Sequence, residues 1–264
     1  MPRFAANLSM MFSEYPFIER FDRAALAGFE AVEFMFPYAE DIPAVRDAIA
    51  RNSLKQPLFN MPPGDWAAGH RGMANDPRRR EEFRRGLETA LEIAVMLGTE
   101  QLNCLAGLKL NDISLDEQWG TFKENLIYAA DRTLVAGVRL VFEPLNKYDN
   151  RGFLLDKPSK AFEIAHELNH PNLKVQYDIY HAQRTEGNMV YTIKQEFAKI
   201  GHVQIADSPY RNEPGTGEIN FPYVLKSLDE AGYDGWVGLE YRPAQGTEYS
   251  LRWLREWGYW PGGN

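Results

Sequence analysis

The sequence predicts an α/β protein that folds as a single (β/α)8 TIM barrel. Short apolar runs alternate with longer amphipathic segments along all 264 residues. An apolar run returns about every 30 residues, as in a parallel sheet whose strands are joined by helices. Eight such units in a chain of this length favour a closed barrel over an open doubly wound sheet. No linker or change of composition divides the chain, so we expect one domain over residues 1–264.

Eight apolar runs are the predicted strands. In chain order they are Phe4–Leu8, Ala31–Phe34, Gln56–Asn60, Gln101–Leu105, Arg139–Glu143, Lys174–Asp178, His202–Ile205 and Trp236–Glu240. Between them, segments such as Glu82–Leu97 and Thr121–Val135 carry apolar residues three and four positions apart, which is the spacing of one helix face. A glycine follows four of the helical segments, where a helix end commonly requires a left-handed residue: Gly28, Gly98, Gly137 and Gly232.

The composition excludes several classes of protein. Charged residues make up 25% of the chain and hydrophobic residues 44%, which is typical of a folded domain and excludes disorder. The net charge of −8 opposes binding to nucleic-acid phosphates, and the one basic run, at 77–80, precedes Glu81 and Glu82 and is interpreted as a solvated helix start. No signal peptide is recognisable, and no apolar run approaches the ~20 residues that span a bilayer. We therefore expect a cytoplasmic protein with neither a nucleic-acid nor a membrane partner.

Cys104 is the only cysteine, which excludes a disulfide within the chain and fits a reducing compartment. Because it lies in an apolar stretch, we interpret it as a small buried strand residue and not as a nucleophile. The segment 251–260 is rich in aromatic residues. We expect it to pack on the core, with a contact in a homo-oligomer as the alternative.

Two loops are longer than the others, at 60–69 and 207–218. They follow the third and seventh predicted strands, at the face of the barrel that carries active sites in this fold. Their glycines and prolines favour lids over a substrate, and purely structural loops are the alternative.

Polar residues stand at or beside the ends of four consecutive strands: Glu143, Asp178, Gln204 and Glu240. In a barrel these strand ends converge above the packed interior. Three carboxylates gathered there repel one another and are costly to bury. A divalent cation removes that cost, and oxygen atoms are the donors that a hard cation prefers. The pattern therefore predicts a metal site.

Several longer stretches match one known family. They are FAANLS (4–9), VEFMFPY (32–38), PGDWAAG (63–69), QYDIYH (176–181), HVQIAD (202–207), EPGTGEIN (213–220) and GWVGLEY (235–241). On these motifs, which span essentially the whole chain, the sequence resembles the hydroxypyruvate isomerase family of the xylose-isomerase-like TIM barrels. The 2-oxo-tetronate isomerases have very similar sequences, and the motifs do not separate the two activities.

The resemblance implies an aldose–ketose isomerase that converts hydroxypyruvate to 2-hydroxy-3-oxopropanoate through a metal-stabilised enediolate. It also implies that Glu143, Asp178, Gln204 and Glu240 hold the metal, and that Glu143 and Glu240 are the acid/base pair. A hydride shift is the alternative to proton transfer. A 2-oxo-tetronate isomerase and, after it, a related sugar epimerase are the alternative activities. A binding protein on an inherited barrel is the remaining alternative, and the two glutamates argue against it because a binder needs no bases.

Gln204 stands where related sugar epimerases and isomerases usually have histidine. An amide oxygen in place of an imidazole favours Mg²⁺, or else Mn²⁺, over zinc-like ions. The DNA-repair endonucleases of this fold use a histidine-rich multi-zinc site. This chain has five histidines, and only His181 and His202 lie near the predicted site, so the nuclease alternative is weakened.

Five further residues are predicted to bind a small anionic hydroxy-keto acid. His181 is expected to donate to a substrate oxygen, Glu33 and Asn60 to form hydrogen bonds with the substrate, and Trp66 to close the pocket as an apolar lid. Arg211 is expected to hold the substrate carboxylate in a bidentate contact. Loop packing is the alternative for His181 and Trp66, and a solvated ion pair with Glu213 or Glu218 is the alternative for Arg211.

Overall fold

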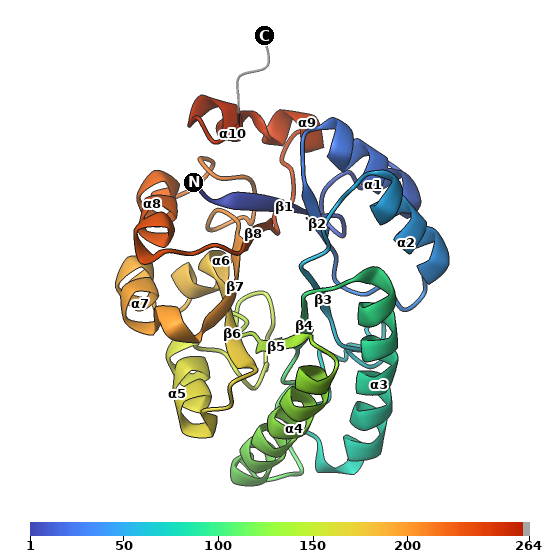
Figure 1. Ribbon diagram of the computed structural model, residues 1–264. Coiled ribbons are helices and arrows are strands. Elements are labelled where there is room, and N and C mark those ends of the chain that lie inside the picture. The colour runs from blue at the N-terminus through green and yellow to red at the C-terminus, as the bar shows by residue number, and fades with distance from the viewer. Residues whose placement is uncertain (261–264) are drawn as a thin grey trace.

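The predicted alternation of strands and helices is present in the computed structural model, which describes residues 1–260. Residues 261–264, the last four of the predicted domain, lie outside the described residues. Figure 1 shows the helices arranged around a central ring of strands. Within the described residues the strands are β1 (Arg3–Asn7), β2 (Ala31–Glu33), β3 (Leu58–Asn60), β4 (Gln101–Cys104), β5 (Arg139–Phe142), β6 (Leu173–Asp178), β7 (Ile200–Ile205) and β8 (Trp236–Leu239).

All strand pairs are parallel, and the hydrogen-bonded order is β2-β1-β8-β7-β6-β5-β4-β3. The seam between β2 and β3 is the least bonded part of the ring. It is joined by a bridge between Ala31 and Lys55 and by a hydrogen bond of 2.8 Å from the Asn60 amide to the Met35 carbonyl. The predicted (β/α)8 barrel is therefore confirmed, as a nearly closed ring.

The helices begin and end where local chemistry favours it. Ser114 caps α4, because its hydroxyl accepts a hydrogen bond of 3.2 Å from the Glu117 amide. Gly98 and Gly232 end α3 and α8 in the left-handed conformation, with φ of 68° and 83°. The α-helices are α1 (Phe17–Leu26), α2 (Ile42–Arg51), α3 (Arg80–Leu97), α4 (Leu115–Val135), α5 (Pro158–Leu168), α6 (Ile179–Gln183), α7 (Met189–Glu196), α8 (Phe221–Ala231), α9 (Thr247–Ser250) and α10 (Arg252–Glu256). Short 3₁₀ turns lie at Pro77–Arg79 and Phe197–Lys199.

The predicted strands agree with the observed ones apart from their ends. The third strand begins at Leu58 and not at Gln56, because Pro57 has no N–H to give to a sheet. Glu143 and Glu240 lie one position beyond β5 and β8. Both glutamates are therefore the first residues to leave the sheet at the carboxyl end of the barrel.

The aromatic C-terminal segment packs on the core. Trp253 and Leu254 are buried. The Phe4 ring lies edge-on to Trp253 and to Tyr259, with centroids 5.5 Å apart in each pair. These contacts join the last helix to the first strand.

Three smaller expectations also have structural counterparts. Arg78 and Arg79 form exposed ion pairs with Asp112 and Glu82, as a solvated helix start does. Cys104 is buried, and burial raises the pKa of its thiol to about 12, so it is no nucleophile. Among residues 1–260, no helix combines the length and the apolar character needed to cross a bilayer.

Candidate active site

Each barrel strand carries a polar side chain at or beside its carboxyl end. The eight residues are Asn7, Glu33, Asn60, Asn103, Glu143, Asp178, Gln204 and Glu240, and all but Asn60 are buried. Six of them were predicted from the sequence, and Asn7 and Asn103 were not. Both could have been predicted, because each interrupts an apolar strand in the same way as the other six residues. Together they form a polar ring above the apolar interior.

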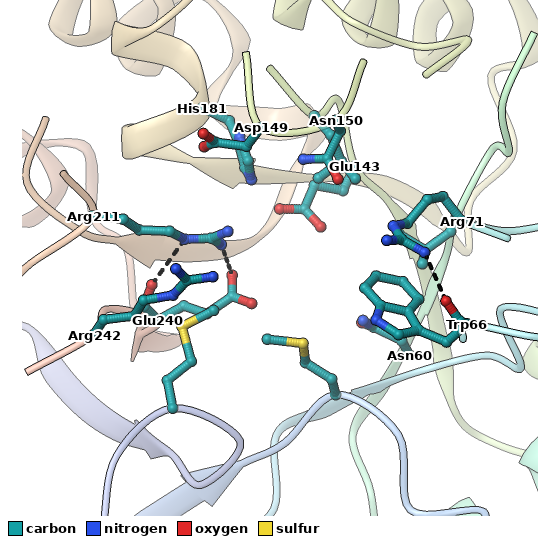
Figure 2. A pocket seen from close by; sticks show the side chains of 14 residues that line it. Asn60, Trp66, Arg71, Glu143, Asp149, Asn150, His181, Arg211, Glu240 and Arg242 are labelled. Carbon is teal, nitrogen blue, oxygen red and sulfur yellow. Dashed lines mark hydrogen bonds and ion pairs between the residues drawn. The ribbon is translucent and has the colours of Figure 1, made fainter. Parts of the chain in front are cut away.

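Two carboxylates of this ring lie close to a histidine, and Arg211 links one of them to a third carboxylate, Glu240. Glu143, Asp178 and His181 each place a potential ligand atom within 4.8 Å of the others. The Arg211 guanidinium lies among these groups, with Nη2 2.9 Å from Glu240 Oε2 and 3.6 Å from Asp178 Oδ2. Figure 2 shows Glu143 and Glu240 extending into the cavity, with Arg211 beside Glu240.

Burial and mutual repulsion make these carboxyl groups weak acids. Burial raises the pKa of Glu143 well above its usual range, and the charges of Glu240 and Asp178 raise it further. Burial also raises the pKa of Glu240 to about 8, although the Arg211 charge lowers it in part. The pKa of Asp178 is raised by burial against the same opposing charge. The charged forms of these three carboxyl groups are therefore disfavoured when no metal cation is bound.

Two of the carboxylate oxygens have no hydrogen-bond partner among residues 1–260. They are Glu143 Oε1 and Asp178 Oδ2, and both are buried. The other oxygen of each group is occupied: Glu143 Oε2 accepts from Asn103 Nδ2 at 3.0 Å, and Asp178 Oδ1 accepts from the Tyr180 amide at 2.7 Å at the start of α6. A buried carboxylate oxygen without a hydrogen bond is costly, and either a proton or a metal ion relieves this cost. The buried Glu/Asp/His group is therefore one that could bind a metal.

Gln204 lies beside Asp178 in the strand register, with its amide fixed by two neighbours. Its Nε2 donates to Glu33 Oε1 at 2.7 Å, and its Oε1 accepts from Gln176 Nε2 at 2.6 Å. Glu33 Oε2 is in turn 2.8 Å from His202 Nε2. Glu33, which we expected to contact the substrate, does not line the cavity. It is fully buried and holds Gln204.

His181 presents an N–H to the site. Its Nδ1 accepts a hydrogen bond of 3.1 Å from the Asn146 amide, which leaves the proton of the neutral ring on Nε2. Burial lowers the pKa of His181 well below its usual value, and the charge of Arg211 adds to this, so the ring is neutral. Nε2 lies 3.6 Å from Asp178 Oδ2. In this tautomer the ring is therefore a donor at this position.

A cavity of about 300 Å³ opens over these groups. Six of the predicted site residues line it: Asn60, Trp66, Glu143, His181, Arg211 and Glu240 (Figure 2). Asp178 and Gln204 do not line it. Arg71 and Arg242 also line it. The sequence places Arg71 among the cations of the active-face loops but predicts no contact of Arg71 with the substrate, and Arg242 was not predicted at all.

Arg211 has different partners from those expected. It forms no ion pair with Glu213 or Glu218 and pairs instead with Glu240 and Asp178. The loop that carries it is fixed by Asp207, which the sequence analysis did not single out. The buried Asp207 carboxylate accepts four backbone hydrogen bonds of 2.8–3.1 Å, from the amides of Ser208, Gly215, Gly217 and Ile219. The Asp207 carbonyl accepts a fifth, of 2.9 Å, from the Arg211 amide.

Comparison with known proteins identifies the family of this chain. A family model described as xylose isomerase-like TIM barrel matches residues 21–257. The hydroxypyruvate isomerase of Escherichia coli is 48% identical over 96% of this chain and 98% of its own length. The 2-oxo-tetronate isomerase of Cupriavidus necator is 46% identical over 97% of this chain and 98% of its own.

A solved structure from Brucella melitensis, described as an AP endonuclease of family 2, superposes with a TM-score of 0.95. It is 44% identical and covers 97% of this chain and 99% of its own. Barrels of lower identity, such as a D-psicose 3-epimerase with a TM-score of 0.78 and 17% identity, share the fold. The chain therefore belongs to the hydroxypyruvate isomerase and 2-oxo-tetronate isomerase family of the xylose isomerase-like TIM barrels, and it is an isomerase.

Proposed function

We propose that the protein converts hydroxypyruvate to 2-hydroxy-3-oxopropanoate, with a 2-oxo-tetronate as the second candidate substrate. The observation that carries this proposal is the pair Glu143 and Glu240, two buried carboxyl groups of raised pKa that line one small cavity. Relatives that bear both activities in their names support the substrate class.

Glu143, Asp178, Gln204 and Glu240 would hold a divalent cation, with Mg²⁺ preferred over Mn²⁺. The unpartnered oxygens of Glu143 and Asp178 support this assignment. Gln204 Oε1 uses one lone pair for Gln176 and keeps a second. When bound, the cation supplies positive charge where the oxygens of the substrate become negative.

Glu143 and Glu240 would carry out the proton transfers. One carboxylate takes a proton from C3 of hydroxypyruvate, the hydroxymethyl carbon, which gives an enediolate with its negative charge on the C2 oxygen. The proton of the O3 hydroxyl passes to the C2 oxygen and the other carboxyl group delivers a proton to C2, which leaves an aldehyde at C3 and a hydroxyl at C2. A pKa near neutrality allows a carboxyl group both to take and to return a proton.

Other cavity residues would orient the substrate. The Nε2–H of His181 is placed to donate to a substrate oxygen, and the Asn60 amide lines the same cavity. Arg211 reaches the reacting end beside Glu240, and Trp66 covers the opposite side of the opening.

The nuclease alternative is less well supported by the site. Among the described residues, the one cluster of potential metal ligands found is that of Glu143, Asp178 and His181, and it contains a single histidine. His166 and His170 pair with Glu196 and Asp131 on outer helices. A histidine-rich multi-metal site is therefore not assembled at the cavity.

Assays of the purified protein on hydroxypyruvate and on 2-oxo-tetronate, with Mg²⁺ and after chelation, test the proposal. We expect turnover of hydroxypyruvate that chelation abolishes, with deuterium at C2 of the product when the reaction runs in heavy water. Turnover of the four-carbon acid alone would favour the second candidate. Product without deuterium would indicate a hydride shift, and no turnover of either acid would refute the proposal.

A further inference from the structure

Arg71 is a cavity-lining arginine on the loop between β3 and α3 that the proposed chemistry does not use. We propose that it binds the carboxylate of the substrate and thereby selects acids over neutral sugars. The inference rests on the proposed function for the class of substrate. It names the residue that recognises the acid group, a role that the sequence analysis gave to Arg211.

The Arg71 guanidinium is fixed in place without an acidic partner. Its Nη1 donates to the carbonyls of Trp66 and His70, at 3.1 and 2.7 Å. Its carbon Cζ lies 3.8 Å from the centroid of a Trp66 ring, in a cation–π contact. Within the part of the chain that the structure describes, no carboxylate forms an ion pair with it. Its charge is therefore left for a ligand.

The loop that carries Arg71 is ordered by its own hydrogen bonds. The amide of His70 donates to the Asp65 carbonyl at 2.9 Å, and the Asp65 amide donates to His70 Nδ1 at 3.0 Å. Gly72 closes the loop through a 2.9 Å bond to the Pro63 carbonyl, and it packs so closely on Leu105 that a Cβ would overlap the Leu105 carbonyl. A guanidinium held in this way loses little freedom when it binds an anion.

The other cations of this face are less suitable. Arg211 is occupied by Glu240 and Asp178. Arg242 is exposed and lies beside Arg211, as Figure 2 shows. Lys109 pairs with Asp156, Lys147 lies over Tyr148, and neither of the two lysines lines the cavity. Among residues 1–260, Arg71 is thus a cavity-lining cation that is held by neutral groups and forms no ion pair.

The arrangement of the cavity suits a short acid. Figure 2 shows Arg71 and Trp66 on one side, Arg211 and Arg242 on the other, and Glu143 and Glu240 between them. In hydroxypyruvate and in 2-oxo-tetronates the carboxylate is attached directly to a reacting carbon. With that carboxylate at Arg71, the reacting carbons extend towards the two glutamates. A neutral sugar has an uncharged group at this position and cannot satisfy the guanidinium.

Arg71→Gln tests the proposal in the intact enzyme. We expect KM for hydroxypyruvate to rise roughly 10- to 100-fold, with a smaller change in kcat, because one charge-assisted contact is lost. Arg71→Lys keeps the charge without the planar fork and should recover part of the loss. Lys147→Gln removes a cation from the same face outside the cavity and should behave as the wild type.

A binding measurement separates this inference from the proposed function. Glycerate is a hydroxy acid that cannot isomerise, and glycerol is its neutral counterpart. Glycerate should raise the Tm of the wild type and of Lys147→Gln but not that of Arg71→Gln, and glycerol should raise none of them. The protein could show no turnover while glycerate, but not glycerol, still raises its Tm in a way that depends on Arg71. That result would sustain the inference and refute the proposed function. An unchanged KM and glycerate shift in Arg71→Gln, or their loss only in Arg242→Gln, would overturn the inference.

Discussion

Glu240 is a buried carboxylate with one close cationic neighbour. Arg211 Nη2 lies 2.9 Å from its Oε2, while the charges of Asp178 and Glu33 act against ionisation. A glutamate so placed changes its protonation state at small energetic cost near neutral pH. Glu248, on α9, is by contrast an exposed glutamate.

Glu240→Gln should lower kcat by roughly 10²–10⁴-fold, because the amide keeps the size and one oxygen but can no longer exchange a proton. Steady-state kinetics on hydroxypyruvate measure the effect, and Glu248→Gln, a change on the surface, is the control. A Glu240→Gln enzyme within a few-fold of the wild-type rate would rule out Glu240 as an acid/base residue.

At the scale of structural elements, the segment between β7 and α8 depends on Asp207. Its carboxylate binds four backbone amides, so one side chain replaces the regular hydrogen bonding that this loop lacks. The absence of a side chain at Gly217 permits this close packing of the loop, because a Cβ there would overlap the Ser208 carbonyl. The same residue binds the Arg211 amide through its carbonyl. The loop therefore fixes the cation that lies at the carboxylates.

Asp207→Asn should destabilise the protein by about 1–3 kcal/mol, since one acceptor oxygen becomes an NH₂ group and two backbone amides of the loop lose their partner. Urea unfolding measures this loss. We expect kcat/KM to fall as well, because Arg211 is no longer held. Asp234→Asn, at an exposed position before β8, is the matched control, and equal stability of the two variants would contradict the role of Asp207.

Strand β8 contains a second constraint of this kind, at Gly238. A Cβ at this position would overlap the Glu33 carboxylate that orients Gln204. Gly238→Ala should therefore cost about 1–3 kcal/mol through overpacking. Gly120→Ala is the control, because Gly120 lies within α4 with nothing near its missing Cβ, and there alanine should add about 0.5–1 kcal/mol. Unfolding curves that move in the same direction for both variants would contradict this account.

At the scale of the whole molecule, metal binding should contribute to folding stability. Removing the cation leaves Glu143, Asp178 and Glu240 balanced mainly by Arg211. Chelation should lower the Tm, and Mg²⁺ at about 100 times its Kd should restore about 2.7 kcal/mol. In Asp178→Asn the Mg²⁺ effect should be much smaller. A wild-type Tm that responds to neither chelator nor Mg²⁺ would exclude the site.

The metal-free protein should also become less stable as the pH rises. The pKa of Glu240 is about 8 in the folded state against a reference value of 4.5, so the folded state binds more protons than the unfolded state between these values. Stability that is present at low pH is therefore lost between about pH 4.5 and 8. The raised pKa values of Glu143 and Asp178 act in the same direction. Melting curves with and without Mg²⁺ test this, and the fall should be smaller with the metal; a metal-free Tm that rises over this range would contradict it.

Much of the architecture was predictable because it depends on local patterns. The eight strands follow from apolar runs at regular spacing, and their ends differ from the predicted ones by only one or two residues. Polar residues that interrupt these runs, such as Asp178 and Glu240, could be assigned to one end of the barrel because parallel strands all end at the same face. The membership of most of the polar ring was therefore determined by the sequence alone.

The partners of these residues were decided only by the tertiary structure. Glu33 and His202 lie 169 positions apart and meet at 2.8 Å because barrel closure brings β2 near β7. Arg211, whose backbone has a left-handed φ of 61°, pairs with Glu240 just after β8 and not with its loop neighbour Glu213. Arg71 lines the cavity, and a hydrogen bond to the His70 carbonyl of its own loop holds its guanidinium there. Local spacing determines which residues reach the carboxyl face of the barrel, but the direction of each side chain on that face depends on contacts between segments that are distant in sequence.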